Sequence, residues 1–251
     1  MSDTIKKGVS IIIPSYNEEK NILKTLENIQ RYVYVEKEVI VVDDSNDATE
    51  KIVREYAQNH PDIIFIKNKP KNRGFVQSLF LGVKSAKKDI VVFVMADQCD
   101  DPRTINLMYD KILAESDIVC GSRYMKGGKR IGGPKWLGYM SRYLCFFSYL
   151  VTRVPTHDVT NSFKMYKKQI LKKMKYNFQA GTAVSMELLF QAYFKNAKII
   201  EVATTWKGRP ETRFKLSQRG PKYIKILQWS LENKLRQSMG LPLRKFYHGN
   251  K

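Results

Sequence analysis

The sequence predicts a doubly wound α/β fold around a mostly parallel sheet, and three observations support this. Short apolar runs rich in β-branched residues alternate with helical patterns through the first 121 residues. Such runs are typical of strands that are covered on both faces of a parallel sheet. The length of 251 residues and the 43% share of hydrophobic residues suit one large domain with its own core.

The first half supplies five strands and four helices in alternation. Strands are predicted at Val9–Ile13, Glu38–Val42, Ile63–Ile66, Ile90–Met95 and Asp117–Gly121. Helices are predicted between them at Glu18–Arg31, Ala48–Asn59, Phe75–Ala86 and Pro102–Glu115. In the first helix, Ile22, Leu26 and Ile29 recur at helical spacing and mark one apolar face. This order of elements predicts βαβ units and therefore parallel pairing.

The second half is less regular. Residues Lys126–Pro134, which read KGGKRIGGP, are predicted to form a flexible basic loop. An aromatic and apolar stretch follows from Trp136 to Arg153. Beyond it we predict helices at Lys167–Met174 and Ser185–Asn196 and a strand at Ile199–Thr205. The last segments are a predicted loop reading WKGRPETRFK and a basic amphipathic helix from Pro221 to Met239. We therefore expect a catalytic domain over residues 1–216 and a basic C-terminal helical extension over residues 217–251.

The charge and the cysteines restrict the class of protein. Lys and Arg total 44 against 24 Asp and Glu, a net charge of +20, which implies an anionic partner. Nucleic acid is disfavoured, because the sequence has no helix-turn-helix, zinc-finger or RNA-binding signature. Three cysteines without a C-x-x-C pair indicate a reducing, cytoplasmic setting. No run of ~20 apolar residues predicts an ordinary transmembrane helix.

Polar clusters follow three of the predicted strands. They are Pro14–Glu18 after the first strand, Asp43–Asp47 after the second and Asp97–Asp101 after the fourth. Ligands of such sheets bind outside the carboxyl ends of the strands, so these clusters should converge on one crevice. Their carboxylates suit Mg²⁺, which binds through one or two carboxylates and substrate phosphates. The alternative is that each cluster only caps the next helix.

Several short motifs lie in a fixed order between Val9 and Leu216. They are PSYNE (14–18), VDDSNDAT (42–49), Asn72-Arg73-Gly74, Ala96-Asp97, GSRY (121–124), DVTNSFKMY (158–166), Glu187, and WKGR (206–209) with Lys215 beyond it. In this order they resemble the family-2 glycosyltransferases of GT-A fold, and most closely the polyprenol-phosphate (dolichol-phosphate) mannosyltransferases. The sequence departs from that pattern at the metal motif D-x-D, whose first acid is Met95 here.

The resemblance implies inverting transfer of mannose or another hexose from a GDP- or UDP-linked sugar to a polyprenyl phosphate, with Mg²⁺ or Mn²⁺. It implies donor contacts from Pro14, Tyr16, Glu18, Asp43, Asp44, Asn72, Gly74, Ala96, Asp97 and Gln98. It implies acceptor contacts from Arg123, Lys135, Glu187, Arg209 and Lys215, and catalytic roles for Asp97, Arg123, Asp158 and Arg209. Asp97 is kept as a metal ligand, with Asp100 as a substitute for the missing acid.

A phosphate acceptor would need cations more than a base. A phosphate monoester has a second pKa near ~6 and is mostly dianionic at neutral pH, so it can attack without a strong base. Arginine suits its positioning, because the planar guanidinium grips phosphate oxygens in pairs. Asp158 is expected to orient Arg123 or the sugar, or to act as base if the acceptor is a hydroxyl.

The aromatic stretch Trp136–Phe147 contains one arginine, Arg142. It is either an interfacial helix that receives a lipid tail or an ordinary buried helix. With the basic excess, the first interpretation predicts peripheral binding at the inner, cytoplasmic face of an anionic membrane.

Three other functions stay open. A family-2 transferase could extend a surface polysaccharide through a sugar hydroxyl, or the chain could bind nucleotide sugars without activity. A kinase or dehydrogenase is the weakest alternative, because the sequence lacks G-K-[ST] and G-x-G-x-x-G.

Overall fold

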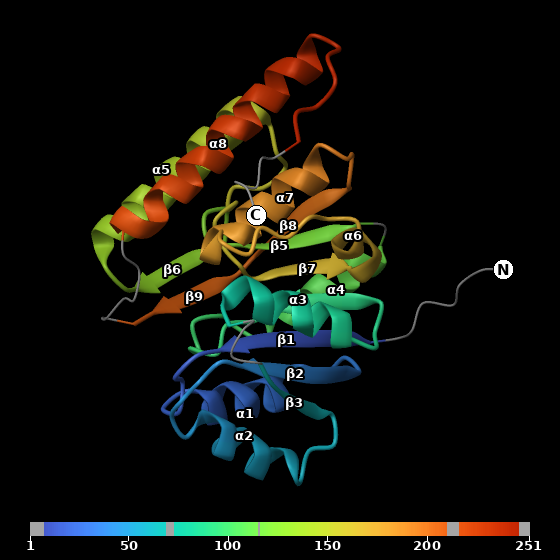
Figure 1. Cartoon of the computed structure of the whole chain (residues 1–251), viewed down its shortest axis with the longest axis vertical. Helices are drawn as coiled ribbons and strands as arrows, with labels where there is room; N and C mark the ends of the chain where they lie inside the picture. The colour runs from blue at the N-terminus through green and yellow to red at the C-terminus, as the bar shows by residue number, and fades with distance from the viewer. Residues whose placement is uncertain (1–7, 69–72, 115, 210–215, 246–251) are drawn as a thin grey trace, which may run out of the picture.

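The computed structural model describes residues 8–68, 73–114, 116–209 and 216–245, and it confirms the α/β fold (Figure 1). Within these residues, seven strands form one sheet in the order β3-β2-β1-β4-β7-β5-β8. They are β1 (Val9–Ser15), β2 (Lys37–Asp43), β3 (Ile63–Lys67), β4 (Ile90–Phe93), β5 (Ile118–Ser122), β7 (Lys164–Lys167) and β8 (Ile199–Ala203). All neighbours are parallel except β7, which is antiparallel to β4 and β5. From β1 the chain adds β2 and β3 on one side and then crosses to the other side of β1 with β4. The topological switch point therefore lies between β1 and β4.

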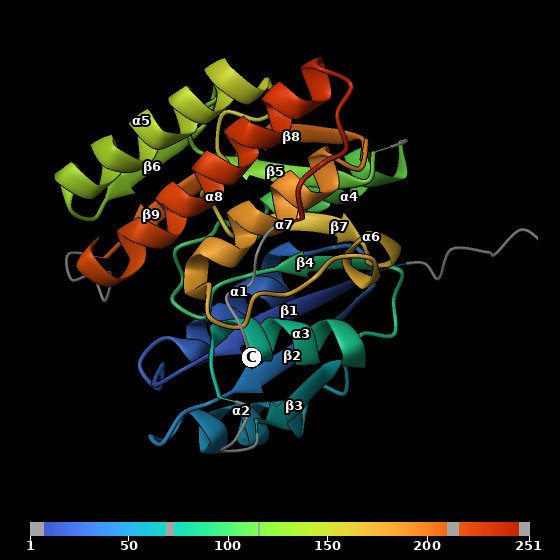
Figure 2. The ribbon, with the colours of Figure 1, turned by 45° about the horizontal axis from the view of Figure 1, so that its top comes forward.

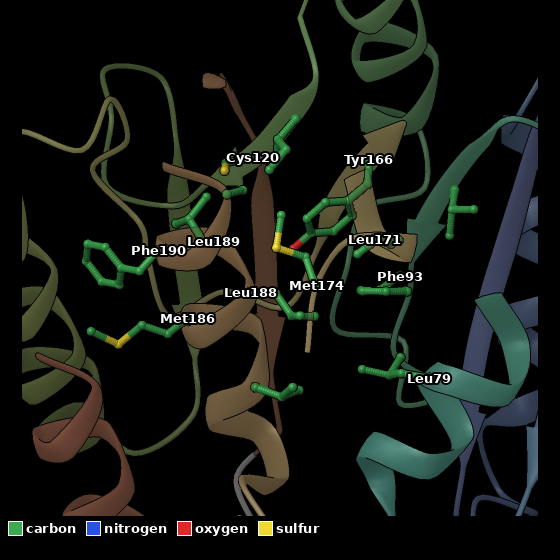
Figure 3. Close-up of a cluster of buried hydrophobic side chains, with 14 of the residues drawn as sticks. Leu79, Phe93, Cys120, Tyr166, Leu171, Met174, Met186, Leu188, Leu189 and Phe190 are labelled. Carbon is green, nitrogen blue, oxygen red and sulfur yellow. The ribbon is translucent and has the colours of Figure 1, made fainter. Parts of the chain in front are cut away.

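Helices cover both faces of the sheet. On one face lie α1 (Ile22–Tyr32), α2 (Thr49–Ala57) and α4 (Thr104–Leu113), and on the other lie α3 (Phe75–Ser85), α6 (Lys168–Lys172) and α7 (Val184–Tyr193), which follows the short 3₁₀ helix η2 (Gly181–Ala183). Consecutive strand residues point to opposite faces. Accordingly, Ile11 and Ile13 belong to the hydrophobic cluster under α1, α2 and α4, whereas Ile12 belongs to the cluster under α3, α6 and α7. Figure 3 shows part of the latter cluster.

The predicted flexible loop at Lys126–Pro134 is wrong. Residues Lys129–Gly132 form strand β6, which pairs in parallel with β9 (Thr205–Gly208), the start of another predicted loop. The pairing was not predicted because the two strands lie far apart in sequence and because their glycines are typical of turns. Gly132, with φ +72°, permits the close approach, because a Cβ there would lie 2.6 Å from the carbonyl oxygen of Gly208.

Strand β7 was not predicted, and the helix predicted from Lys167 begins one residue later as α6. The strand reads KMYK, and its lysines suggest a surface segment. Lys164 is nevertheless fully buried, and its ammonium donates to the main-chain oxygens of Asn161 and Val159, the latter at 3.2 Å. Hydrogen bonds of this kind make a buried lysine tolerable.

Two long helices, α5 (Lys135–Thr152) and α8 (Leu216–Ser238), lie side by side at one end of the molecule (Figures 1 and 2). Helix α8 begins before the predicted start at Pro221. It buries Ile226, which belongs to the same cluster as α7, whereas Ile224 and Leu235 are 54% and 65% exposed. Among the described helices, none has the length and apolar character needed to cross a membrane.

Candidate active site

The three predicted polar clusters meet at the carboxyl edge of the sheet. The first two are joined by main-chain donors: Asn17 N donates to Ser45 Oγ at 2.7 Å, and Glu18 N donates to Thr49 Oγ1 at 3.0 Å. Arg209 joins the third cluster to the first, because its Nη2 lies 3.2 Å from both Glu18 Oε1 and Asp97 Oδ2. The three clusters therefore converge at one edge of the sheet, as expected.

Asp43 and Asp44 follow β2 and have different surroundings. Asp43 is buried and pairs with Lys67 at 2.8 Å. Asp44 Oδ2 accepts hydrogen bonds from Gly74 N at 2.8 Å and Ser78 Oγ at 3.1 Å, but its buried Oδ1 has no partner within the described part of the chain. A buried carboxylate oxygen without a donor is costly, so it points to a ligand.

The remaining predicted donor contacts surround these two acids. Gly74, with φ +137°, precedes α3, and a Cβ there would have open space. Tyr16 is 55% exposed in the loop after β1, where Pro14 is paired within the sheet. Asn72 lies outside the described residues.

The loop after β4 is held by hydrogen bonds at several points. Ala96 O accepts from Thr25 Oγ1 on α1 at 2.9 Å, and Asp97 Oδ1 accepts from Cys99 N at 3.2 Å. Gln98 has a positive φ of 63°, and its amide donates to Asn21 Oδ1 at 3.1 Å. These contacts fix the loop against α1 and leave Asp97 partly exposed beside Arg209.

Asp100 is the second carboxylate of this loop. It is buried, and its Oδ2 accepts from Met95 N at 3.1 Å. Burial, and then the negative charge of Asp97, raise the pKa of Asp100 to about 7. Asp101, by contrast, lies nearer the surface and pairs with Arg103 at 3.0 Å.

Asp97 and Asp100 supply carboxylate oxygens, the ligand type of a hard divalent cation that also binds a diphosphate. Among the described residues, no group of three His, Cys, Asp or Glu is arranged to hold a metal. Mg²⁺ needs only one or two carboxylates when substrate phosphates complete its shell. Met95 and Cys99 carry soft sulfur atoms, and burial raises the pKa of the Cys99 thiol, so neither replaces a missing acid.

Arg123 and Asp158 form a buried ion pair at the end of β5. Arg123 Nε donates to Asp158 Oδ2 at 2.7 Å and Nη2 donates to Oδ1 at 2.8 Å, while Nη2 also reaches Thr160 Oγ1 at 2.9 Å. Burial alone would raise the pKa of Asp158, but the Arg123 charge outweighs it and holds that pKa below its usual value. The pair therefore stays ionised, and its charges cancel.

A cavity of about 280 Å³ opens beside this pair, between α5, α8 and β9. Its wall is mostly apolar and comprises Arg123, Arg130, Leu137, Met140, Ser141, Leu144, Thr160, Trp206, Gly220, Tyr223 and Ile224. Arg130 donates to the main-chain oxygens of Gly132 at 3.0 Å and Pro134 at 3.2 Å, and no described carboxylate pairs with it. The pocket therefore combines an apolar wall with one uncompensated positive charge.

The other predicted acceptor residues lie elsewhere. Lys135 is exposed at the first residue of α5, and Lys215 is outside the described residues. Glu187 is buried on α7, where burial raises its pKa to about 8 and Gln191 Nε2 donates to it at 3.1 Å. Arg209 lies with Glu18 and Asp97 rather than in the pocket wall.

Sequence analysis missed Arg130 and Tyr223 as site residues and gave no role to Trp206. Arg130 stands in a glycine-rich stretch that was predicted to be a loop. The only available signal was its position between the GSRY motif and the aromatic helix, because its neighbour Trp206 is brought to it by the pairing of β6 with β9.

Sequence comparisons relate the chain to known proteins. The family described as "Glycosyl transferase family 2" matches residues 10–175. The chain is 29% identical to the dolichol-phosphate mannosyltransferase of Pyrococcus furiosus over 82% of its own length, and it spans only 59% of that relative. It is 23% identical to the polyprenol monophosphomannose synthase of Mycolicibacterium smegmatis, with 92% of this chain and 90% of the relative covered.

The structural comparison shows the fold. The glucosyl-3-phosphoglycerate synthase of Mycobacterium tuberculosis, crystallised with Mn²⁺, UDP and glucosyl-3-phosphoglycerate, superposes with a TM-score of 0.66. The match has 17% identity and covers 94% of this chain and 81% of that protein. With the family match over more than half of its residues, the chain belongs to glycosyl transferase family 2, and it is a glycosyltransferase of GT-A fold.

Proposed function

We propose that this enzyme transfers a hexose from a nucleotide sugar to a prenyl phosphate at a membrane surface. The observation that carries the proposal is the apolar pocket with Arg130 in its wall, next to the Arg123–Asp158 pair. A ligand with a phosphate and a hydrocarbon tail matches both features. The two relatives are named dolichol-phosphate mannosyltransferase and polyprenol monophosphomannose synthase, and these names support this acceptor class.

The donor would bind beside the polar clusters at the carboxyl edge of the sheet. Asp44 offers its buried Oδ1 to the nucleoside, and Asp97 and Asp100 would hold Mg²⁺ or Mn²⁺ on the diphosphate. The metal would neutralise the negative charge that develops on the leaving group. Complexes of the structural relative with Mn²⁺ and UDP-glucose support a nucleotide-sugar donor here.

In the reaction, a phosphate oxygen of the acceptor attacks the anomeric carbon of the sugar. The bond from that carbon to the diphosphate breaks, and the nucleoside diphosphate leaves. Arg130, whose charge no described carboxylate neutralises, lowers the repulsion between the two anionic groups as they approach, because guanidinium groups bind phosphate oxygens directly.

The surroundings of Asp158 argue against a hydroxyl acceptor that relies on this residue as base. Arg123 occupies both carboxylate oxygens, and Asn161 N and Thr160 Oγ1 each donate to Oδ1 at 3.2 Å. A general base must be within reach of the proton it abstracts and have a pKa near the working pH. Asp158 has a lowered pKa and is fully buried, whereas a phosphate dianion needs no such base.

A transfer assay tests the proposal. The enzyme is given GDP-mannose, UDP-glucose and UDP-N-acetylglucosamine in turn with Mn²⁺, and each donor is offered to a short-chain prenyl phosphate, the matching prenol, phosphoglycerate and a free sugar. We expect transfer to the prenyl phosphate alone. Because the pocket volume is near the lower limit for small-molecule sites, we expect it to hold the phosphate and the adjoining isoprene units, so that short chains suffice. Transfer to the free sugar but not to the prenyl phosphate would establish the polysaccharide-extending alternative.

The outer surface of α5 and α8 should bind a membrane. Tyr139, Tyr143 and Phe146 on α5 are 63%, 72% and 62% exposed, so α5 is not an ordinary buried helix. Aromatic side chains favour the bilayer interface, and the net charge of +20 attracts anionic headgroups.

We therefore expect binding to vesicles of phosphatidylserine and phosphatidylcholine, and release by high salt, since salt screens exposed charges within ~8 Å. Replacing Tyr143 and Phe146 together by serine should lower the partition coefficient about tenfold or more in vesicle sedimentation. Tyr34→Ser is the matched control, because Tyr34 is 81% exposed in the loop after α1. Equal binding to neutral and anionic vesicles would count against this role.

A further inference from the structure

We propose that Trp206 is a positioning residue that orients Arg130 toward the acceptor phosphate while leaving its positive charge unneutralised. The inference rests on the proposed function, and it concerns how the pocket is built. No part of the proposed reaction so far uses Trp206, although its indole is part of the pocket wall.

The pairing of β6 with β9 sets Trp206 directly beside Arg130. The two residues are partners in the register of these parallel strands. The guanidinium carbon of Arg130 lies 5.0 Å from the centroid of the indole ring, and that of Arg123 lies 5.7 Å from it. Both arginines of the pocket are therefore within cation–π distance of one ring.

Glycines fix the ring in this place. A Cβ on Gly208 would lie 2.3 Å from the indole, and a Cβ on Gly133 would lie 3.4 Å from it and 3.0 Å from the guanidinium of Arg130. At Gly138, a Cβ would lie 2.7 Å from the same guanidinium. The glycines of this segment thus give Trp206 and Arg130 the room to pack closely against the backbone.

The chemical nature of the contact matters for phosphate binding. The usual partner of a half-buried arginine is a carboxylate, as Asp158 is for Arg123. A carboxylate beside Arg130 would cancel its charge and repel an incoming phosphate dianion. The indole attracts the cation through its ring quadrupole but carries no formal charge, so Arg130 keeps its charge for the ligand.

A double-mutant cycle on acceptor kinetics tests the inference with a short-chain prenyl phosphate and saturating donor. We expect Trp206→Leu to raise the acceptor KM roughly tenfold, within the ~2- to 30-fold range of a cation–π contact, and to change kcat and donor KM by less than about twofold. Trp206→Phe should restore part of the loss, because phenylalanine keeps a smaller ring. In an Arg130→Leu background, Trp206→Leu should have almost no further effect, since a residue that acts through Arg130 is not additive with it.

Several outcomes would overturn the inference. Additive effects of the two substitutions, an equal loss in Trp206→Phe and Trp206→Leu, or a fall in kcat with an unchanged acceptor KM would each assign Trp206 a merely structural role. Tyr34→Leu is the control, because Tyr34 is an exposed aromatic residue in the loop after α1 and lies outside the pocket wall. A wild-type enzyme that is not saturated by prenyl phosphate would instead refute the proposed function, and this inference with it.

Discussion

Replacing Asp97 by asparagine is expected to abolish turnover, with a loss of at least ~100-fold, while the fold is retained. Asp97 is the one acid left at the D-x-D position, and its side chain is 27% exposed. Asparagine keeps an oxygen for Cys99 N, and Arg209 keeps its partner Glu18. The lost negative charge should therefore affect the cation and the diphosphate rather than folding.

Donor binding can be measured separately from activity. A ligand at 100 times its Kd stabilises the folded state by ~2.7 kcal/mol, which raises Tm by about 5–10 °C in a chain of this size. We expect UDP or GDP with Mn²⁺ to produce such a shift in the wild type, a smaller one in Asp100→Asn and none in Asp97→Asn. Asp101→Asn is the control and should keep the full shift, because Asp101 pairs with Arg103 near the surface. A normal Mn²⁺-dependent shift in Asp97→Asn would show that Asp97 does not bind the metal.

Local patterns in the sequence were sufficient to predict the strands of the first half and the polar clusters that follow them. The strands of the first half are buried on both faces and read as apolar runs, and the polar clusters follow the strand ends directly. Contacts such as that of Glu18 N with Thr49 Oγ1 then follow from parallel pairing of consecutive βα units. Asp158 was expected to orient Arg123 or the sugar, or to act as a base, and in the structure it pairs with Arg123 at 2.7 Å.

The second half of the chain depends on contacts between distant segments. No periodicity indicates that the KGGKRIGGP stretch pairs with Thr205–Gly208, yet this pairing sets Arg130 beside Trp206. The same pairing explains why Arg209 lies on the donor side. Strand β9 runs along the loop after β4, with Lys207 N donating to Cys99 O at 2.9 Å, and this directs the next residues toward Glu18 and Asp97. Strand β7 was also not predicted, because a lysine in the sequence suggests an exposed residue. Lys164 can be buried only because main-chain oxygens accept hydrogen bonds from its ammonium group, and the sequence does not show these contacts.

The two pocket arginines should respond differently to substitution, although both line the pocket wall. Arg123→Ala leaves Asp158 buried without its partner, and breaking a buried ion pair costs ~3–5 kcal/mol. We expect this variant to lose both stability and activity, so that its kinetics alone do not define a role in acceptor binding. Arg123→Lys keeps the charge but loses the paired contact with Asp158, and it should recover only part of either property.

Arg130→Ala is the substitution that isolates the acceptor. Arg130 donates only to main-chain oxygens among the described residues, so its loss leaves no carboxylate unpaired. Removing a charge-assisted contact of ~1.5–3 kcal/mol should lower kcat/KM for a short-chain prenyl phosphate roughly ten- to a hundredfold. Donor affinity and Tm should change little, because Arg130 lies in the pocket wall and not beside Asp44 and Asp97.

The control for Arg130→Ala is Arg142→Ala, which removes an exposed arginine from α5 outside the pocket wall. With a soluble short-chain acceptor and no vesicles, this variant should keep wild-type kinetics. If the acceptor is instead a sugar hydroxyl, the order of effects should invert: Asp158→Asn would be the most damaging change for that acceptor, and Arg130→Ala would have little effect. Unchanged prenyl-phosphate kinetics in Arg130→Ala would refute the assignment of this pocket to the acceptor phosphate.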